Sequence, residues 1–270
     1  MNEDKLQKLV ESSGFIPHKK AIDVLRNDGW KLLISPYYYD NISNSVKEID
    51  LIAEKQFTSD AQWSGSSVQI NVQLFIECKY IKQEILLWFD SKDLNRAVSK
   101  VEQNTGLRVL HNRGRADIVR DELHYLSSNQ VAKLFSSNAH NEDVIYKAVT
   151  QSLNAQLYYD QSNNNPLFFD FFSHKEVATM TLRYPIIICD NFANLKEIKF
   201  EENDADKYKV SNIDGHFQIE TNYTFLDIEK KARTEYFLID LLNVSDMKNY
   251  LDKLSIEVRK IMSAVDMKRY

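Results

Sequence analysis

Two short segments of the chain place charged side chains inside apolar surroundings. The first, EIDLIA, contains Glu48 and Asp50, and the second, FIECK, contains Glu77 and Lys79. Both have the composition of a strand, in which alternate side chains share a face, so each segment presents its two charged residues on one side. Buried carboxylates cost free energy unless a cation holds them. If the two strands are neighbours, these residues meet, and oxygen ligands of this kind suit a divalent ion such as Mg²⁺.

The pattern resembles the PD-(D/E)xK nucleases, also called the restriction-endonuclease-like family. In that family an Asp on one strand precedes a D/E-x-K element on the next strand. Here Asp50 matches the first acid, and Glu77, Cys78 and Lys79 match the second element. Residues 14–30 (GFIPHKKAIDVLRNDGW) match the helix-then-strand entry. The resemblance covers roughly residues 14–80 well and is most similar to the Mrr-type and junction-resolvase members.

The resemblance implies a function as well as a set of roles. Asp50, Glu77 and the backbone carbonyl of Cys78 would hold one or two Mg²⁺ ions, for which Mn²⁺ can substitute. Lys79 would lie beside the attacking water and help to neutralise the charge of the transition state. The expected activity is a Mg²⁺-dependent deoxyribonuclease that hydrolyses phosphodiester bonds of DNA in defence, restriction or DNA processing.

Four further residues are candidates for accessory roles, and each has an ordinary structural alternative. His18 occupies the place in the first helix where many relatives carry a Glu, and Glu11 lies upstream as a possible substitute. Gln151 falls on the helix expected after the active strands, but Ala155 stands where a Gln-x-x-x-Tyr motif requires tyrosine. Glu48 is either an outer ligand or a solvated charge at a strand end.

Two alternatives to an active nuclease remain open at this level. The charged segments could be edge strands whose side chains face water. The chain could also have a nuclease fold without catalysis and act as a nucleic-acid-binding or assembly subunit, which the missing acid at His18 favours. A phosphotransferase has no support, because the sequence contains no GxxxxGK[ST] loop.

The overall charge does not indicate nucleic-acid binding by itself. The chain has 34 basic and 39 acidic residues, for a net charge of −5, whereas nucleic-acid-binding domains usually carry a basic surface. One local cluster within residues 107–120 contains Arg108, Arg113 and Arg115, which could contact DNA phosphates. The alternative is an exposed loop. A homodimer, in which two sites cut two strands, is a further expectation.

Composition favours a cytoplasmic protein without a membrane segment. The sequence has no run of 18 apolar residues, and its N-terminus is charged, unlike a signal peptide. Cys78 and Cys189 both lie in apolar strand-like runs, which predicts buried thiols in a reducing compartment. No ligand spacing typical of a structural zinc site is present.

Hydrophobic periodicity predicts an α/β fold with a sheet covered by helices on both faces. The resemblance implies the finer arrangement, which is a three-layer αβα sandwich with a central mixed sheet, a restriction-endonuclease-like core and a C-terminal elaboration. We expect one domain over residues 1–270, with the site core within about 14–160 and the strands and helix of 184–267 completing the fold. The expected helices are 17–28, 93–102, 128–135, 142–159 and 245–267, and residues 3–12 are expected as either a short helix or a flexible lead-in. The expected strands are 31–39, 46–54, 68–82, 84–89, 184–189, 217–225 and 235–242, with a loop at 200–215.

Overall fold

The computed structural model describes residues 3–59, 67–110, 118–119, 123–137, 144–161, 167–169, 178–190, 192–201, 204–213 and 215–267. The α-helices are α1 (Glu3–Ser12), α2 (Phe15–Asn27), α3 (Leu94–Thr105), α4 (His124–Ser127), α5 (Val144–Gln161) and α6 (Met247–Met267). The strands are β1 (Lys31–Ile34), β2 (Tyr37–Asp40), β3 (Ser45–Glu48), β4 (Leu51–Ser59), β5 (Val68–Tyr80), β6 (Ile85–Ser91), β7 (Val109–Leu110), β8 (Ile118–Val119), β9 (Gln130–Ser137), β10 (Ala178–Asp190), β11 (Leu195–Glu201), β12 (Asp204–Asn212), β13 (Phe217–Leu226) and β14 (Ala232–Asn243). Within these ranges, no helix combines the length and apolar character needed to cross a membrane.

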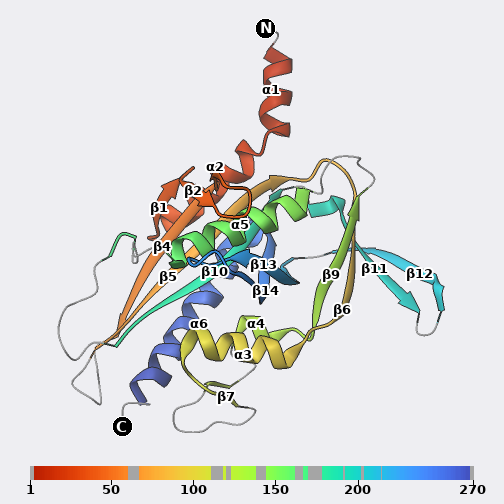
Figure 1. The fold of residues 1–270 in the computed structure, drawn as a ribbon. Helices are drawn as coiled ribbons and strands as arrows, with labels where there is room; N and C mark the ends of the chain where they lie inside the picture. The colour runs from red at the N-terminus through yellow and green to blue at the C-terminus, as the bar shows by residue number, and fades with distance from the viewer. Residues whose placement is uncertain are drawn as a thin grey trace.

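A large mixed sheet forms the centre of the molecule (Figure 1). Its ten strands follow the order β1-β4-β5-β10-β14-β13-β9-β6-β11-β12. Strand β4 is antiparallel to β5, whereas β5 and β10 are parallel and pair along their whole lengths. Strand β10 is also parallel to β14. The expectation of a mixed α/β fold with a central mixed sheet is therefore confirmed.

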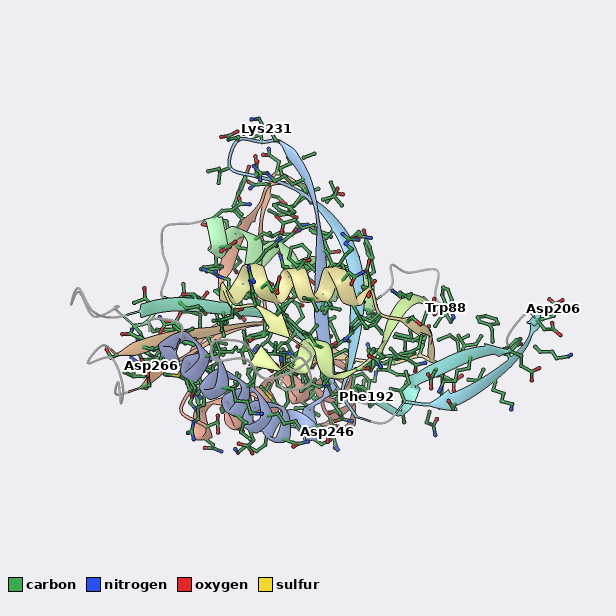
Figure 2. All side chains as sticks on the ribbon, turned by 90° about the horizontal axis from the view of Figure 1, so that it is seen from below. Trp88, Phe192, Asp206, Lys231, Asp246 and Asp266 are labelled. Carbon is green, nitrogen blue, oxygen red and sulfur yellow. The ribbon has the colours of Figure 1, made fainter. Side chains whose placement is uncertain are left out.

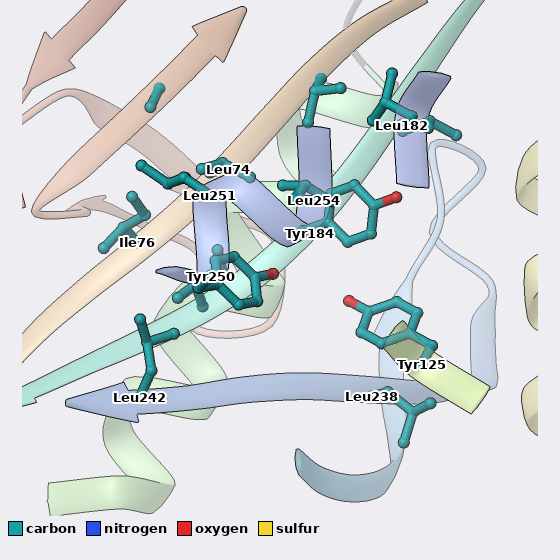
Figure 3. Packing of buried hydrophobic residues seen from close by; sticks show 14 of the residues in the cluster. Leu74, Ile76, Tyr125, Leu182, Tyr184, Leu238, Leu242, Tyr250, Leu251 and Leu254 are labelled. Carbon is teal, nitrogen blue, oxygen red and sulfur yellow. The ribbon is translucent and has the colours of Figure 1, made fainter. Parts of the chain in front are cut away.

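Helices cover both faces of this sheet. On one face, alternate residues of β5 such as Leu74 and Ile76 pack against α2 and α6. Figure 3 shows this core, where Leu251 and Leu254 of α6 lie over the strands. On the other face, α5 contributes a separate apolar cluster with β10, β13 and β14. Because apolar burial contributes about 25 cal/mol per Å², these two cores stabilise the packing of the helices on the sheet.

The chain makes an excursion out of the main sheet just before the candidate site. The expected strand 31–39 is interrupted at Ser35, which has a φ of 51°, and at Pro36, which has no N–H to donate to a ladder. The expected strand 46–54 is also wrong: β3 pairs with β2 in a separate two-stranded sheet, and β4 begins only at Leu51. Asp50 therefore lies in the bend between two sheets rather than inside a strand.

Two other predictions about the elements are wrong. The expected helix at 128–135 is mostly strand β9, which pairs antiparallel with β6, and the short helix α4 ends before this range. The expected loop at 200–215 is largely the second strand of a β11–β12 hairpin. Figure 2 shows this hairpin extending from the body of the molecule, with Asp206 near its tip. Its strands are recognisable only from their pairing, because charged residues interrupt the apolar pattern.

Candidate active site at the end of strand β5

Asp50 lies beside the edge of β5 just beyond the point where its partner strand β4 ends. The β4–β5 ladder runs only as far as Leu51 opposite Ile76. Beyond this pair the Oδ2 atom of Asp50 accepts the backbone N–H of Cys78 at 2.7 Å. The bend is itself held by backbone hydrogen bonds, because Ser35 N donates to Asp50 O at 2.9 Å. The carboxylate of Asp50 is thus placed directly beside residues 77–79.

Glu77 and Lys79 form a buried ion pair on the face of β5 that α5 covers. The Nζ atom of Lys79 lies 2.5 Å from Oε2 of Glu77, and Glu77 is only 1% exposed. The other carboxylate oxygen, Oε1, is also buried and has no hydrogen-bond partner among the described residues. Since an unpaired buried acceptor costs about 1–3 kcal/mol, Oε1 is an atom that a ligand would satisfy.

The protonation states follow from this burial. Burial raises the pKa of Glu77 to about 7, with Lys79 opposing the rise and the charge of Asp50 adding to it. Burial alone would lower the pKa of Lys79. The attraction of the Glu77 and Asp50 carboxylates for the cation is larger than this effect, so the pKa of Lys79 lies above its ordinary value. Lys79 is therefore a cation at neutral pH, whereas Glu77 gains and loses its proton near pH 7.

Helix α2 brings its N-terminus against the same point of β5. Gly14, with a φ of 58°, precedes the helix, and a Cβ built on it would lie 3.6 Å from the carbonyl oxygen of Cys78. The N–H and C=O of a strand residue point to the same side, so this carbonyl lies on the side of Asp50. One turn into α2, the Nε2 atom of His18 is buried without a hydrogen-bond partner in the described part of the chain.

Helix α5 approaches the site from the opposite face. Ser152 Oγ donates to the carbonyl of Phe75 at 2.8 Å, which fixes the helix on β5 two residues before Glu77. Gln151 Nε2 donates to the backbone carbonyl of Glu48 at 3.4 Å. The Oε1 atom of Gln151 is buried and makes no hydrogen bond within the ranges that the structure describes.

Tyr38 is a further buried group near the site that sequence reasoning missed. It is 2% exposed and packs with Phe75 and Ala155 between the sheet and α5. Burial raises the pKa of Tyr38, and the charges of Asp40 and Glu77 raise it further. Its hydroxyl has no partner in the described residues. The run of three tyrosines in residues 37–39 was the only signal in the sequence, and it does not say which ring is buried.

The structure brings some of the predicted residues together and not others. Asp50, Glu77, Cys78 and Lys79 converge, and His18 and Gln151 reach the same end of β5 from α2 and α5. Glu48 and Asp50 were expected on one strand face, which is wrong because they lie in different elements: the Glu48 side chain is exposed at the end of β3, and only its carbonyl reaches Gln151.

The remaining predicted residues lie away from this convergence or outside what the structure describes. Glu11 belongs to α1, a helix separate from α2, and its side chain is outside the described residues. Arg108 is exposed after the end of α3. Arg113 and Arg115 lie outside the described residues.

The donor set around Cys78 suits a hard cation. The carboxylates of Asp50 and Glu77 and the Cys78 carbonyl are oxygen ligands of the kind that Mg²⁺ prefers. In the part of the chain that the structure describes, no cluster of three or more His, Cys, Asp or Glu side chains could hold a metal. A metal at this point would therefore rest on two carboxylates, one backbone oxygen and water. The unpartnered Oε1 of Glu77 fits that arrangement.

A second polar cluster lies on the opposite face of the sheet and is complete in itself. The His124 ring lies between Glu257 (Nδ1 to Oε2, 2.7 Å) and Asp240 (Nε2 to Oδ2, 3.1 Å). Asp240 also accepts from Tyr250 at 2.8 Å and pairs with His216 at 2.7 Å. Burial alone would lower the pKa of His124. The two carboxylates have the larger effect and raise this pKa to about 10. This cluster is a buried structural network.

Both cysteines are buried and free, as the sequence predicts. Burial raises the pKa of Cys78 well above its ordinary value and that of Cys189 to about 12. Cys78 therefore contributes its backbone, and not a thiolate, to the site.

Comparison with known protein families, curated proteins and solved structures finds no match to this chain. Its fold and candidate site define it as a mixed α/β protein with two carboxylates and a lysine at the end of a central strand.

Proposed function

We propose that the protein is a metal-dependent nuclease of the restriction-endonuclease-like class that hydrolyses phosphodiester bonds of DNA. The observation that carries this proposal is the convergence of Asp50, Glu77 and Lys79 around the Cys78 backbone. The buried, unpartnered Oε1 of Glu77 adds the need for a ligand at that point. Two acids and a lysine in this order, on adjoining segments, form the motif of that class.

The order of elements agrees with the proposal. Helix α2, strands β4 and β5, helix α5 and strand β10 occur in this order along the chain, with β1–β3 between α2 and β4 and with β6–β9, α3 and α4 between β5 and α5. Strand β4 is antiparallel and β10 parallel to β5. Helices on both faces give the three layers expected for the class. The continuous sheet leads us to infer one domain, in which the strands and helix after β10 are a C-terminal elaboration.

Each residue has a definite part in the proposed reaction. Asp50, Glu77 and the Cys78 carbonyl would hold Mg²⁺, which polarises the scissile phosphate when bound. Protonated Lys79 would donate a hydrogen bond to the attacking water or to a phosphate oxygen and offset the negative charge that develops there. Glu77 orients Lys79 through their 2.5 Å contact. Tyr38 and Gln151 line the same region from the α5 side.

The biological setting is part of the proposal. A cytoplasmic enzyme of DNA restriction, defence or processing suits the chemistry, and cutting both strands would be served by a homodimer. Exposed Arg108 is the one member of the predicted arginine cluster that the structure places, and we propose that it contacts phosphates.

A cleavage assay tests the proposal. Supercoiled plasmid and single-stranded DNA are incubated with Mg²⁺ or Mn²⁺ and with wild type, Asp50→Ala or Lys79→Ala. We expect cleavage by wild type and a loss of at least about 100-fold in both variants, the size typical of removed acid–base or electrostatic groups. Glu48→Ala is the control, because that side chain is exposed, and it should cleave normally. A Lys79→Ala enzyme with the wild-type rate would refute the assigned role.

One observation favours a second function. Helix α2 carries His18 where an acid would complete the site, which suits a nuclease-fold subunit that binds nucleic acid without cutting it. A protein of that kind would bind DNA and gain no thermal stability from Mn²⁺. An intact metal site would raise the melting temperature with Mn²⁺.

A further inference from the structure

The β11–β12 hairpin leaves the body of the molecule with one apolar and one polar face. Strand β11 pairs in parallel with β6 and antiparallel with β12, and register partners on neighbouring strands share a face. The apolar hairpin face consists of Trp88 on β6, Ile198 and Phe200 on β11, and Tyr208 and Val210 on β12. The opposite face carries Glu197, Lys199, Lys209 and Ser211. The hairpin is therefore amphipathic.

The apolar hairpin face is exposed to solvent. Phe200, Tyr208 and Val210 are 45%, 58% and 49% exposed. Phe200 lies edge-on to the ring of Trp88 at 6.4 Å and to that of Tyr208 at 6.1 Å, so the three rings form a row. Figure 2 shows Trp88 where the hairpin leaves the body and Asp206 near its tip. Because a two-stranded hairpin is at best marginally stable in water unless its apolar face is covered, this row favours a partner.

The tip of the hairpin is acidic. Its sequence at 201–206, EENDAD, contains four acids and no basic residue. Asp204 pairs with Lys207 at 2.9 Å. The carboxylates of Glu201 and Asp206 have no ion-pair partner among the residues that the structure describes, and both side chains are exposed. The tip therefore has negative charge available for a partner.

The other end of the apolar hairpin face, next to the body of the molecule, carries a cation. Lys196 lies two residues before Ile198 on the same face, and its Nζ donates to Oδ1 of Asn212 at 2.6 Å. In the described part of the chain no carboxylate pairs with it. The face thus presents a lysine, an apolar row and an acidic tip, in that order. Two copies stacked antiparallel about a twofold axis would place each acidic tip against the lysine of the other copy.

We propose that the apolar hairpin face is the contact through which two copies of this chain form a dimer. A nucleic acid or an anionic membrane fits this face less well, because the acidic tip repels phosphates. The seven residues of β11 make the face roughly 20 Å long, at about 3.3 Å per residue. Two such faces bury on the order of 1,000 Å² in total, at the lower end for specific complexes, so we expect a micromolar Kd.

This contact gives a surface to the homodimer of the proposed function, but it does not depend on nuclease activity. Five strands separate β11 from β5 in the sheet, which at about 4.8 Å between neighbours places the two roughly 30 Å apart. Association can be measured without DNA or metal. Asp50→Ala should dimerise as wild type does, so a failed cleavage assay would leave this result unchanged.

Sedimentation velocity of the full chain, from about 1 to 100 µM, brackets the expected Kd. The double variant Tyr208→Thr/Val210→Thr keeps strand-forming residues and removes apolar surface. It should raise the Kd at least about tenfold. Tyr37→Thr is the matched control, because Tyr37 is a strand tyrosine that is 65% exposed on β2, and it should dimerise normally. A wild type that stays monomeric, an unchanged Kd in the double variant, or an equal loss in the control would overturn the proposal.

Two charge-reversed variants test the antiparallel arrangement. Lys196→Glu makes both ends of the face acidic, and Glu201→Lys/Asp206→Lys makes both ends basic. Each alone should associate at least about tenfold more weakly than wild type, because like charges meet. An equimolar mixture should form heterodimers with nearly the wild-type Kd, since opposite charges then meet at both ends. Unchanged melting temperatures show that the variants fold. A mixture that associates no better than either variant alone would refute the antiparallel pairing of two copies.

Discussion

Replacing Glu77 by glutamine should stabilise the protein while removing its proposed activity. Burial raises the pKa of Glu77 from 4.5 to about 7, and each tenfold change in proton affinity corresponds to about 1.4 kcal/mol. Ionised Glu77 therefore destabilises the metal-free folded state by about 3 kcal/mol above pH 7. No discount for solvent screening applies, because the residue is 1% exposed. Glutamine has nearly the same shape and cannot ionise.

The sign of the pH dependence follows from proton uptake. Between pH 4.5 and pH 7 the folded wild type retains the proton that the unfolded chain has lost, so its unfolding free energy falls as pH rises through this window. The Glu77→Gln variant lacks this fall. The two proteins should have similar stability at pH 4.5 and differ by about 3 kcal/mol at pH 8, which is a difference of roughly 6–12 °C in melting temperature for a chain of this size.

Thermal unfolding in buffer with a metal chelator, at pH 4.5, 6 and 8, measures this difference. Glu48→Gln is the matched control, because the same substitution at an exposed carboxylate should give no pH-dependent gain. A Glu77→Gln protein that melts below wild type at pH 8, or a gain of equal size at every pH, would refute the reasoning. The cleavage assay on the same variant should show loss of activity, which separates stability from function.

Three further predictions address other parts of the structure. Mn²⁺ should raise the melting temperature of wild type but not of Asp50→Ala, and an equal rise in both would place the metal elsewhere. The thiols of Cys78 and Cys189 should not react with a thiol reagent at pH 8 in the folded protein and should both react in denaturant, because burial raises their pKa values; rapid reaction of native protein would contradict their burial. The imidazolium of His124 contributes stability that is fully present below its ordinary pKa of 6.5 and is lost as pH rises through about 10. His124→Gln should therefore lower the free energy of unfolding by about 3–5 kcal/mol at pH 7. Denaturant titrations at pH 7 and 10 should show that this loss is smaller at pH 10.

Local periodicity predicted the elements whose burial is decided by their own sequence. The apolar stripe at a spacing of three to four residues predicted α2, α5 and α6, and the nearly continuous apolar run predicted β5. The convergence of Asp50, Glu77 and Lys79 was expected on the condition that the two segments are neighbours, and the resemblance to the nuclease motif supported that pairing. These features need no information about distant parts of the chain.

Features that depend on distant partners could not be predicted in this way. Strands β9 and β12 have no clear apolar alternation, and their pairing with β6 and β11 decides their conformation. The expected strand 46–54 is divided at Asp50 into β3 and β4. Pro36 ends the ladder of β1, and the Asp50 carboxylate accepts the N–H of Cys78. His124 binds carboxylates 116 and 133 residues away, so nothing near it in the sequence identifies its role.

The excursion from Ser35 to Asp50 has a consequence for how this protein can vary. The hydrogen bonds from Ser35 N to Asp50 O (2.9 Å) and from Ile49 N to Pro36 O (3.1 Å) tie together the two ends of the β2–β3 sheet. The exposed turn at 41–44 is remote from this base. Insertions or deletions there should leave Asp50 in place beside Cys78. Natural variants can therefore remodel the turn, and a new binding specificity could evolve there, without disturbing the candidate site below it.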